Sequence, residues 1–361
     1  MKSENSKAHS EMREAIQRIA VGPDRGRDIS RSAAASIIQA VLAGHIDEIQ
    51  TAVFLIALRM KRESMAEFQG LFDGLGASCN TVTADVDELV CLADPFDGYV
   101  RTSTMTPFIA PVLAACGMTV LMHGVESVGP KHGITAHKVY ALAGMDCHQS
   151  VDAAAMRLAN DGCSYLDQST YAADLYALGD LRDRIVKRTA LTTLERLLMP
   201  VKGLQRTHLI LGYVHKAYPE IYAKVAEQAG YDSILLLKGV EGGLAPALNK
   251  PLRRFFFNRP LPQTLDSEKE LIQLENLALA KTAAAAPIEN QSSRVEECLE
   301  AGLSVLNGRP GLARDSLCLA AAVIVFTHNK SLSLAQAVEK VQFCLDNGSA
   351  RVRFDAMISN R

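Results

Sequence analysis

Residues 181–206 carry a dense group of basic side chains. Seven of them stand against two acidic ones, a local charge of +5 in a chain whose formal net charge is −2. Basic side chains neutralise phosphates, so the pattern predicts a phosphate-binding patch. If residues 181–198 are helical, Arg184, Lys187 and Arg188 lie on one side of that helix. The alternative is an ordinary solvated helix face. The candidate contacts are Arg182, Arg184, Lys187, Arg188, Arg196, Lys202 and Arg206.

A second basic cluster surrounds three consecutive aromatic residues. Lys250, Arg253, Arg254 and Arg259 have no acidic residue among them and enclose residues 255–257, which are all phenylalanine. Cations that follow phosphates beside rings that stack on bases are typical of single-stranded nucleic-acid sites. Arg253 and Arg254 therefore join the candidate contacts. The alternative is that three phenylalanines in an apolar strand belong to the core.

A third group of residues follows the order loop, helix, strand and His-Gly. Residues 93–98 read Ala-Asp-Pro-Phe-Asp-Gly, and residues 101–107 read Arg-Thr-Ser-Thr-Met-Thr-Pro. An apolar run then leads to Gly117, and residues 118–124 end in His-Gly. A loop of this kind binds phosphates when glycines let backbone N–H groups approach them closely.

This layout resembles the phosphoribosyl-diphosphate site of anthranilate phosphoribosyltransferases and related family 3 glycosyltransferases. Their loop reads G-T-G-G-D-G, and their later element reads K-H-G-N-R. The resemblance covers nearly the whole chain. It implies a small helical N-terminal domain and a larger α/β domain with a mostly parallel central sheet, of the nucleoside phosphorylase and class II phosphoribosyltransferase type. It places a vestigial phosphoribosyl-diphosphate site at Asp97, Gly98, Arg101, Thr102, Thr106, His123 and Gly124.

The chain departs from the family where the chemistry is most demanding. Pro95 removes a backbone donor from the loop. Met122 and Glu126 stand where the family has a lysine and an arginine, and Leu244 and Ala245 match an Asp-Glu pair that holds magnesium. A hard cation needs charged oxygen ligands, and neither residue supplies one. We therefore expect no turnover of phosphoribosyl diphosphate, no catalytic residue, no cofactor and no bound metal.

Further motifs are similar to those of the YbiB-type DNA-binding branch of these proteins. They are Met105-Thr106-Pro107, His123-Gly124-Val125, Arg188-Thr189 and the run Lys-Gly-Val-Glu-Gly at residues 238–242. This resemblance implies homodimers that join through the helical N-terminal domain and bind DNA or RNA with little sequence preference near the old active site. The alternative is a magnesium-dependent phosphoribosyltransferase that uses phosphoribosyl diphosphate.

The elements that position these residues follow from periodicity. Residues 11–79 read as helices that begin after Ser30, Asp47 and Ser64, which can act as N-caps. We expect a helical domain over residues 1–82, with helices near 181–202 packed on it, and an α/β domain over 83–361. Strands are predicted at 88–92, 118–122, 207–214 and 233–238, with an edge strand at 250–259. A linker is predicted at 281–293, followed by helices near 294–307, 311–327 and 332–346.

Composition sets the remaining expectations. The longest apolar runs fall short of the roughly 20 residues that span a bilayer, so we expect no membrane association. The first residues lack the apolar segment of a signal peptide, which makes the cytoplasm the expected location. The eight cysteines include no C-x-x-C pair, and we expect reduced thiols in the core. Surplus apolar residues for a dimer interface are expected among Ile37, Val41, Val53 and Phe54.

Overall fold

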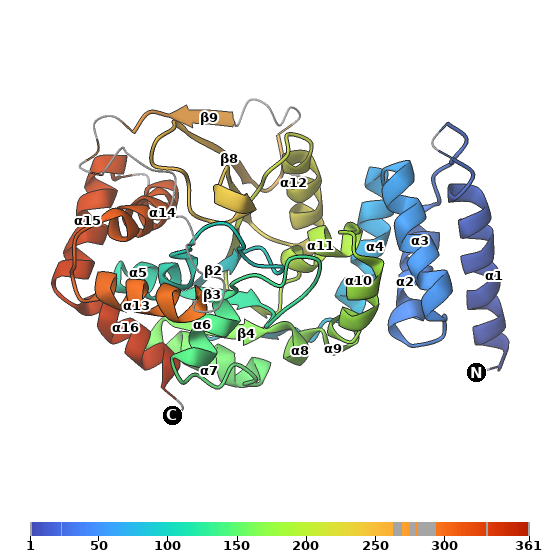
Figure 1. Ribbon diagram of the computed structural model, residues 1–361, viewed down its shortest axis with the longest axis horizontal. Helices are drawn as coiled ribbons and strands as arrows, with labels where there is room; N and C mark the ends of the chain where they lie inside the picture. Colours follow the sequence, from blue (N-terminus) through green and yellow to red (C-terminus); the bar gives the residue numbers. More distant parts are fainter. Residues whose placement is uncertain are drawn as a thin grey trace.

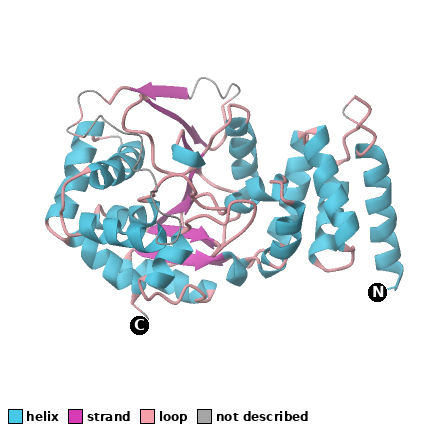
Figure 2. Ribbon diagram, in the orientation of Figure 1, coloured by secondary structure: helices cyan, strands magenta, loops and turns pink. Residues whose placement is uncertain are grey.

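A small helical domain lies at one end of the molecule and an α/β domain makes up the rest (Figure 1). The computed structural model describes residues 2–22, 24–262, 269–274, 277, 279, 294–329 and 331–359. In the α/β domain, strands run through the centre with helices on both sides (Figure 2). The C-terminal helices lie at the end opposite the helical domain. The fold class expected from the sequence is confirmed.

The helical domain begins each of its later helices at the predicted cap. The side chains of Ser30, Asp47 and Ser64 accept hydrogen bonds from backbone N–H groups of α2, α3 and α4. Such caps satisfy donors that have no partner inside the helix, and each contributes about 1 kcal/mol. The four helices are α1 (Lys2–Ile19), α2 (Arg31–Leu42), α3 (Glu48–Lys61) and α4 (Met65–Ala77).

The interior of this bundle absorbs most of the apolar residues that we expected to be in surplus. Ile37, Val41 and Phe54 are buried within one chain, so the expectation that they are left over for a partner was wrong. Val53 is different, because it is 42% exposed. It lies on the outward side of α3 with Ile49 and Met60, which are 78% and 70% exposed.

The α/β domain is built on one twisted sheet. Among the described residues its strand order is β4-β3-β2-β6-β7-β8-β9. The first five strands in that order are parallel, whereas β8 and β9 pair antiparallel to their neighbours. The strands are β2 (Glu88–Ala93), β3 (Val120–Gly124), β4 (Cys163–Asp167), β6 (Arg206–Gly212), β7 (Ser233–Leu237), β8 (Leu252–Asn258) and β9 (Lys269–Ile272). A separate two-stranded pair joins β1 (Val82–Thr83) to β5 (Val201–Lys202).

Alternate residues of the central strands belong to two different cores. In β2, Leu89 and Cys91 pack on the side of the helical domain, whereas Val90 and Leu92 pack on the side of the C-terminal helices. Side chains alternate between the faces of a strand, so a sheet covered on both faces needs apolar residues at every position. This explains why the central strands read as continuous apolar runs.

Helices cover the two faces and the ends of this sheet. Short helices carry the chain from β4 to β6. The helices are α5 (Ile109–Ala115), α6 (Ala136–Leu142), α7 (Val151–Asp161), α8 (Gln168–Tyr171), α9 (Ala173–Tyr176), α10 (Gly179–Ile185), α11 (Ala190–Leu194), α12 (Tyr218–Ala229), α13 (Arg294–Leu306), α14 (Leu312–His328), α15 (Leu334–Asp346) and α16 (Ser349–Ile358), with short 3-10 helices η1 (Thr106–Phe108), η2 (Glu195–Leu197) and η3 (Val240–Gly242).

Several predicted elements differ from the structure. Residues 181–198 do not form one helix, because α10 ends at Ile185 and its C-cap residue, Val186, has a φ of 62° that breaks the helix before α11 begins. The strand near 250–259 is not at the edge, because β9 pairs on its outer side. Strand β4 and helix α16 were not predicted. The linker expected at 281–293 lies outside the described residues.

Two expectations from composition, on the cysteines and on membrane-spanning segments, can be compared with the structure. The structure forms no disulfide among the eight cysteines, and seven of them are buried, as expected for core cysteines. Across the part of the chain that the structure describes, no helix combines the length and the apolar character needed to cross a membrane.

Candidate functional site

A cavity of about 400 Å³ opens where the helical domain meets the carboxyl ends of strands β2 and β6. Ligands of open α/β sheets bind at this end of the strands, where the connecting loops leave the sheet. The helical domain supplies residues from α3 and α4, and the α/β domain supplies the loops after β2, β6 and α10. The lining includes Arg59, Glu63, Phe68, Pro95, Phe96, Asp97, Lys187, Arg188, Thr189, Thr192, Thr193, Arg196, Tyr213, His215, Tyr218, Tyr222 and Glu241.

The loop after β2 is held together by a buried carboxylate. Asp94 accepts hydrogen bonds from the Tyr99 hydroxyl at 2.7 Å, the Thr106 hydroxyl at 2.5 Å and the Leu244 backbone N–H at 3.2 Å. Burial raises the pKa of Asp94, although these bonds oppose that shift. Thr106 was expected at the phosphate site. In the structure its hydroxyl is buried and bonded to Asp94.

Asp97 is the acidic residue of this loop that lines the cavity, and it is already paired with two cations. Its Oδ1 lies 3.2 Å from Lys131 Nζ, and its Oδ2 accepts hydrogen bonds from both Nε and Nη2 of Arg188, the former at 2.8 Å. The side chain of Asp97 is 4% exposed. Gly98 follows with a φ of 72°, and a Cβ there would collide with the backbone of Gly133.

His123 lies beneath the cavity rather than in its wall. The residue is 1% exposed, and its Nδ1 lies 3.1 Å from the Tyr171 hydroxyl. Its ring packs edge-on against Phe96, which does line the cavity. Burial, together with the charge of Arg196, lowers the pKa of His123 to about 3. The imidazole is therefore neutral at physiological pH and supplies no positive charge to a phosphate. Gly124 follows at the end of β3, against the ring of Tyr165.

Arg101 and Thr102 lie beside the carboxylate of Glu241. In the sequence this residue stood out only as part of the run Lys-Gly-Val-Glu-Gly at residues 238–242. The backbone N–H groups of Arg101 and Thr102 both donate to Glu241 Oε1 at 3.0 Å, and the Thr102 hydroxyl donates to the same oxygen at 2.9 Å. The donors expected at the vestigial site are thus engaged by a residue of the chain itself.

Three of the predicted nucleic-acid contacts are buried and are held by partners within the chain. Arg182, Arg196 and Arg254 are 5%, 6% and 6% exposed. Arg182 forms a two-point pair with Glu195, with both N–O distances 2.7 Å. Arg196 donates to the carbonyl oxygens of Ala93 and Gly212 at 2.8 and 3.1 Å. Arg254 pairs with Glu270 and donates to Thr327. A buried cation needs such partners. Arg196 nevertheless lines the main cavity, whereas Arg182 and Arg254 do not.

The remaining basic residues are spread over different surfaces. Arg184 lies 2.5 Å from Glu48 and 2.9 Å from Asp180, and Arg206 pairs with Glu88. Lys202 lines a separate cavity of about 230 Å³. The helix break at Val186 removes the shared helix face that we predicted for Arg184, Lys187 and Arg188. Lys187 and Arg188 remain exposed at the rim of the main cavity, whereas the partly buried Arg253 lies on β8.

The second basic cluster does not present its phenylalanines to a ligand. Phe255 and Phe257 are 7% and 1% exposed and stack on each other at a ring distance of 5.9 Å. They belong to the core on the side of the helical domain, and Phe256 packs against the opposite core. The alternative that these residues are core was correct.

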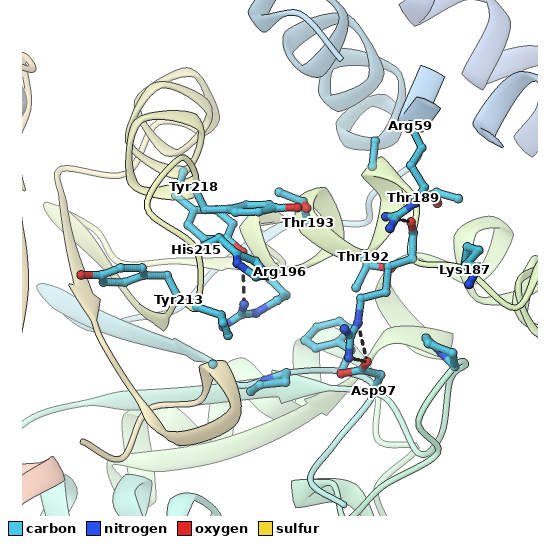
Figure 3. Close-up of a pocket in the computed structure, with 18 of the residues that line it drawn as sticks. Arg59, Asp97, Lys187, Thr189, Thr192, Thr193, Arg196, Tyr213, His215 and Tyr218 are labelled. Atoms are coloured by element: carbon cyan, nitrogen blue, oxygen red, sulfur yellow. Dashed lines mark hydrogen bonds and ion pairs between the residues drawn. The ribbon is translucent and has the colours of Figure 1, made fainter. Parts of the chain in front are cut away.

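Sequence reasoning missed the aromatic wall of the cavity. Figure 3 shows Tyr213, His215 and Tyr218 on one side, with Arg59, Thr189 and Lys187 across from them. Lys238 Nζ lies 5.4 Å from the centre of the Tyr213 ring, within the range of a cation–π contact. Their place in the sequence could have indicated them, because Tyr213 and His215 directly follow β6 at its carboxyl end.

The residues present do not fit a catalytic magnesium ion. Leu244 and Ala245 are buried among apolar side chains and offer no ligand. Asp94 is bonded to Tyr99 and Thr106, and Asp97 is paired with Lys131 and Arg188. Within the residues that the structure describes, no group of three or more His, Cys, Asp or Glu side chains could hold a metal. Magnesium needs oxygen ligands that are free to coordinate it.

Relatives of this chain share its length and architecture. Anthranilate phosphoribosyltransferase of Nitrosomonas europaea is 24% identical over 323 residues, covering 89% of this chain and 91% of the relative. A protein of Aquifex aeolicus with no assigned function is 25% identical over 321 residues, covering 88% of this chain and 94% of that one.

Solved structures support the same fold. Anthranilate phosphoribosyltransferase of Saccharomyces cerevisiae, in complex with PRPP and Mg, superimposes with a TM-score of 0.75 at 13% identity, covering 96% of both chains. The Thermus thermophilus enzyme has a TM-score of 0.72 at 17% identity, covering 96% of this chain and 98% of that one.

Two family models match the two parts of the chain. Residues 10–79 match the helical bundle domain of the glycosyl transferase family, and residues 97–351 match its a/b domain. The second match alone covers more than half of the 361 residues. The chain therefore belongs to this glycosyl transferase family.

Proposed function

We propose that this protein binds DNA or RNA with little sequence preference and does not turn over phosphoribosyl diphosphate. The observation that carries the proposal is the cavity between the two domains. Lys187 and Arg188 are exposed at its rim, and the exposed His215 and the half-buried Tyr218 line it. Cations that neutralise phosphates, next to rings on which bases stack, are what a sequence-tolerant single-strand site requires.

The charge distribution favours a local site. The formal net charge of −2 gives no general attraction for a polyanion. Lys216 is exposed in the same loop as His215, and Lys238 lies beside the Tyr213 ring, so these cations extend the basic rim on the side of β6. Arg253 adjoins Lys238, whose backbone N–H donates to the Arg253 carbonyl at 2.9 Å. Lys202 and Arg206 lie on other surfaces and contribute to a longer bound strand only through long-range electrostatics.

The donor set at the old active site argues against catalysis. Transfer of a phosphoribosyl group needs a cradle for pyrophosphate and a metal ion on it. In this chain the cradle donors at Arg101 and Thr102 are bonded to Glu241, and Asp97 is neutralised by Arg188 and Lys131. The apolar Leu244 and Ala245 take the place of the metal ligands. The resemblance to the YbiB-type branch supports the same proposal.

The alternative is a magnesium-dependent phosphoribosyltransferase. It is favoured by the names of relatives such as the Nitrosomonas europaea protein, which is 24% identical across nearly all of both chains. It requires that the loop after β2 and the 239–243 turn rearrange to release donors and ligands. Leu244 and Ala245 cannot become ligands in any arrangement, so we place this alternative second.

The proposal includes a homodimer formed through the helical domain. Ile49, Val53 and Met60 follow one another along α3 at intervals of four and seven residues, which puts them on one side of the helix. All three are exposed in the single chain. An exposed apolar stripe of this kind is typical of an interface, and a symmetric pair would bring the same stripe together from both subunits.

The test is a titration of a labelled single-stranded oligonucleotide, with and without phosphoribosyl diphosphate and magnesium as competitors. We expect binding that is lost at high salt and is unaffected by the competitor beyond its ionic strength. A product assay with anthranilate runs in parallel and should detect no phosphoribosyl-anthranilate. Absence of oligonucleotide binding at low salt would reject the nucleic-acid proposal, and product formation would promote the alternative.

A further inference from the structure

The thiols of Cys116 and Cys344 face each other between two helices. Cys116 caps the C-terminal end of α5, and Cys344 lies in the last turn of α15. Their sulfur atoms are 3.8 Å apart, although the residues are 228 positions apart in the chain. The Cys344 sulfur also lies 3.4 Å from the carbonyl oxygen of Ala115, which holds it against the end of α5. Two thiols in contact are the arrangement from which a disulfide bond forms.

This pair lies closer to solvent than the other buried cysteines. Cys116 and Cys344 are 6% and 5% exposed, and their chain neighbours Gly117 and Phe343 are exposed. The other five buried cysteines are 3% exposed or less, namely Cys91, Cys147, Cys163, Cys298 and Cys318. A small oxidant therefore meets less cover at this pair than at any other buried thiol of the chain.

Ionisation also sets this pair apart. The Cys116 thiol donates a hydrogen bond to Cys344 and lowers the pKa of that thiol. The Ser349 hydroxyl and the charge of Lys340 act in the same direction, against burial. Burial raises the pKa of the remaining thiols, to about 11 at Cys79 and to about 12 at Cys91, Cys147, Cys163, Cys298 and Cys318. Because the thiolate is the nucleophile, Cys344 is the thiol that attacks an oxidant first.

We propose that Cys116 and Cys344 form an oxidation site, which a hydroperoxide converts to a disulfide bond that locks α5 to α15. The Cys344 thiolate attacks one oxygen of hydrogen peroxide, the O–O bond breaks, and Cys344 becomes a sulfenic acid. The hydroxide that leaves takes up the proton that Cys344 gave up. The Cys116 sulfur then attacks the sulfenic sulfur, the S–O bond breaks, and the Cys116 proton leaves with the hydroxyl group as water. The two thiols thus lose two electrons, and the peroxide becomes two water molecules.

The bond would tie together two parts of the α/β domain that are far apart in the sequence. A cross-link between residues 228 positions apart closes a long loop, and such cross-links stabilise a fold mainly by restricting the unfolded chain. Figure 1 shows α15 at the end of the molecule opposite the helical domain, and neither cysteine lines the main cavity. The oxidation site is therefore independent of nucleic-acid binding.

Two single variants separate the roles of the two thiols. In Cys116→Ser the sulfenic acid of Cys344 has no thiol to react with, so dimedone should label it. In Cys344→Ser the Cys116 thiol should stay free under the same treatment. Cys147→Ser is the matched control, because the buried Cys147 contacts the carbonyl oxygen of His137 instead, and it should form the same link as the parent. Equal dimedone labelling of Cys116 and Cys344 in these variants would overturn the order of attack.

The main test needs no variant. The reduced parent is treated with hydrogen peroxide, its remaining thiols are alkylated after denaturation, and the digest is mapped by mass spectrometry without reductant. We expect the peptides of Cys116 and Cys344 to be joined until dithiothreitol separates them, and the oxidised protein to unfold several degrees higher than the reduced one. The proposal is overturned if both thiols are still free once the half-exposed Cys79 is oxidised, if Cys116 is joined to Cys318 instead, or if the linked protein unfolds at the temperature of the reduced protein.

Discussion

Arg188 Nε lies 2.8 Å from Asp97 Oδ2, so a cation at the rim of the cavity is paired with the acidic residue of the vestigial loop. Arg188 is half-exposed while Asp97 is almost fully buried. The pair therefore links Arg188, which a polyanion can reach, to Asp97, which it cannot reach. A phosphate that approaches Arg188 must compete with Asp97 for the guanidinium group.

Replacing Asp97→Asn should strengthen nucleic-acid binding. The change removes the charge that holds Arg188 and Lys131, and the freed guanidinium can then contact a phosphate. We expect a several-fold lower Kd at low salt and a salt dependence steeper by about one unit, as for one added phosphate contact. Fluorescence anisotropy with an oligonucleotide measures both.

The matched control for this change is Asp180→Asn. It removes the carboxylate that lies 2.9 Å from Arg184, a residue that keeps its pair with Glu48 and does not line the cavity. Binding should change less than in Asp97→Asn. Weaker binding in Asp97→Asn than in the parent would contradict the role given to this pair.

The exposed stripe on α3 predicts the assembly state. The parent should have the mass of a dimer by light scattering, and Val53→Glu should shift it toward a monomer, because an interface core tolerates an unpaired charge poorly. Val352→Glu is the control, since Val352 is 67% exposed on α16, away from the helical domain. A parent that stays monomeric across a wide concentration range would count against the interface.

Arg182 should matter for stability rather than for binding. Its guanidinium pairs with Glu195 at 2.7 Å, and Glu195 is fully buried. Arg182→Ala leaves that carboxylate without its cation, and breaking a buried pair from one side costs about 3–5 kcal/mol. Urea denaturation measures the loss. Replacing both residues by leucine should restore much of the stability, and an unchanged midpoint in Arg182→Ala would refute this assignment.

His123 predicts an acid-sensitive contribution to folding. Its pKa in the folded protein is lowered to about 3, whereas the unfolded chain takes up the proton near pH 6.5. Stability from the neutral imidazole is thus fully present above that pH. It falls by up to about 1.4 kcal/mol per pH unit as the pH drops toward 3. His123→Gln cannot titrate, so its free energy of unfolding should fall less steeply between pH 6 and about pH 4 than that of the parent. Parallel curves would show that His123 is not buried in its neutral form.

Periodicity and capping rules recovered the framework of the fold because those signals are local. Ser30, Asp47 and Ser64 begin their helices where the sequence placed them, and the apolar runs at β2, β6 and β7 are strands. Strand β4 was missed because Cys-Ser-Tyr-Leu-Asp has neither an apolar run nor a regular alternation. The break at Val186 was missed because a β-branched residue is a poor candidate for positive φ, so only tertiary contacts could select it.

The site was harder to predict because charge alone does not report burial. Arg182 and Lys187 are five residues apart and look alike in the sequence, yet one is held by Glu195 and the other faces solvent. The partner that decides between them lies thirteen residues from Arg182 on a different helix. Tyr213 and Tyr218 join the cavity only because the carboxyl end of β6 meets the helical domain.

Nucleic-acid binding at the cavity is tested by measuring oligonucleotide affinity against salt for the parent and for Lys187→Ala with Arg188→Ala. Both residues line the cavity rim, so the double variant should bind all sequences more weakly, with a log–log salt slope flatter by up to about two units. Arg309→Ala with Arg351→Ala removes two exposed or half-exposed cations near the C-terminal helices and serves as the matched control. Weaker binding and a flatter slope are expected only for the cavity variant. Indistinguishable curves for the parent and that variant would refute binding at the cavity.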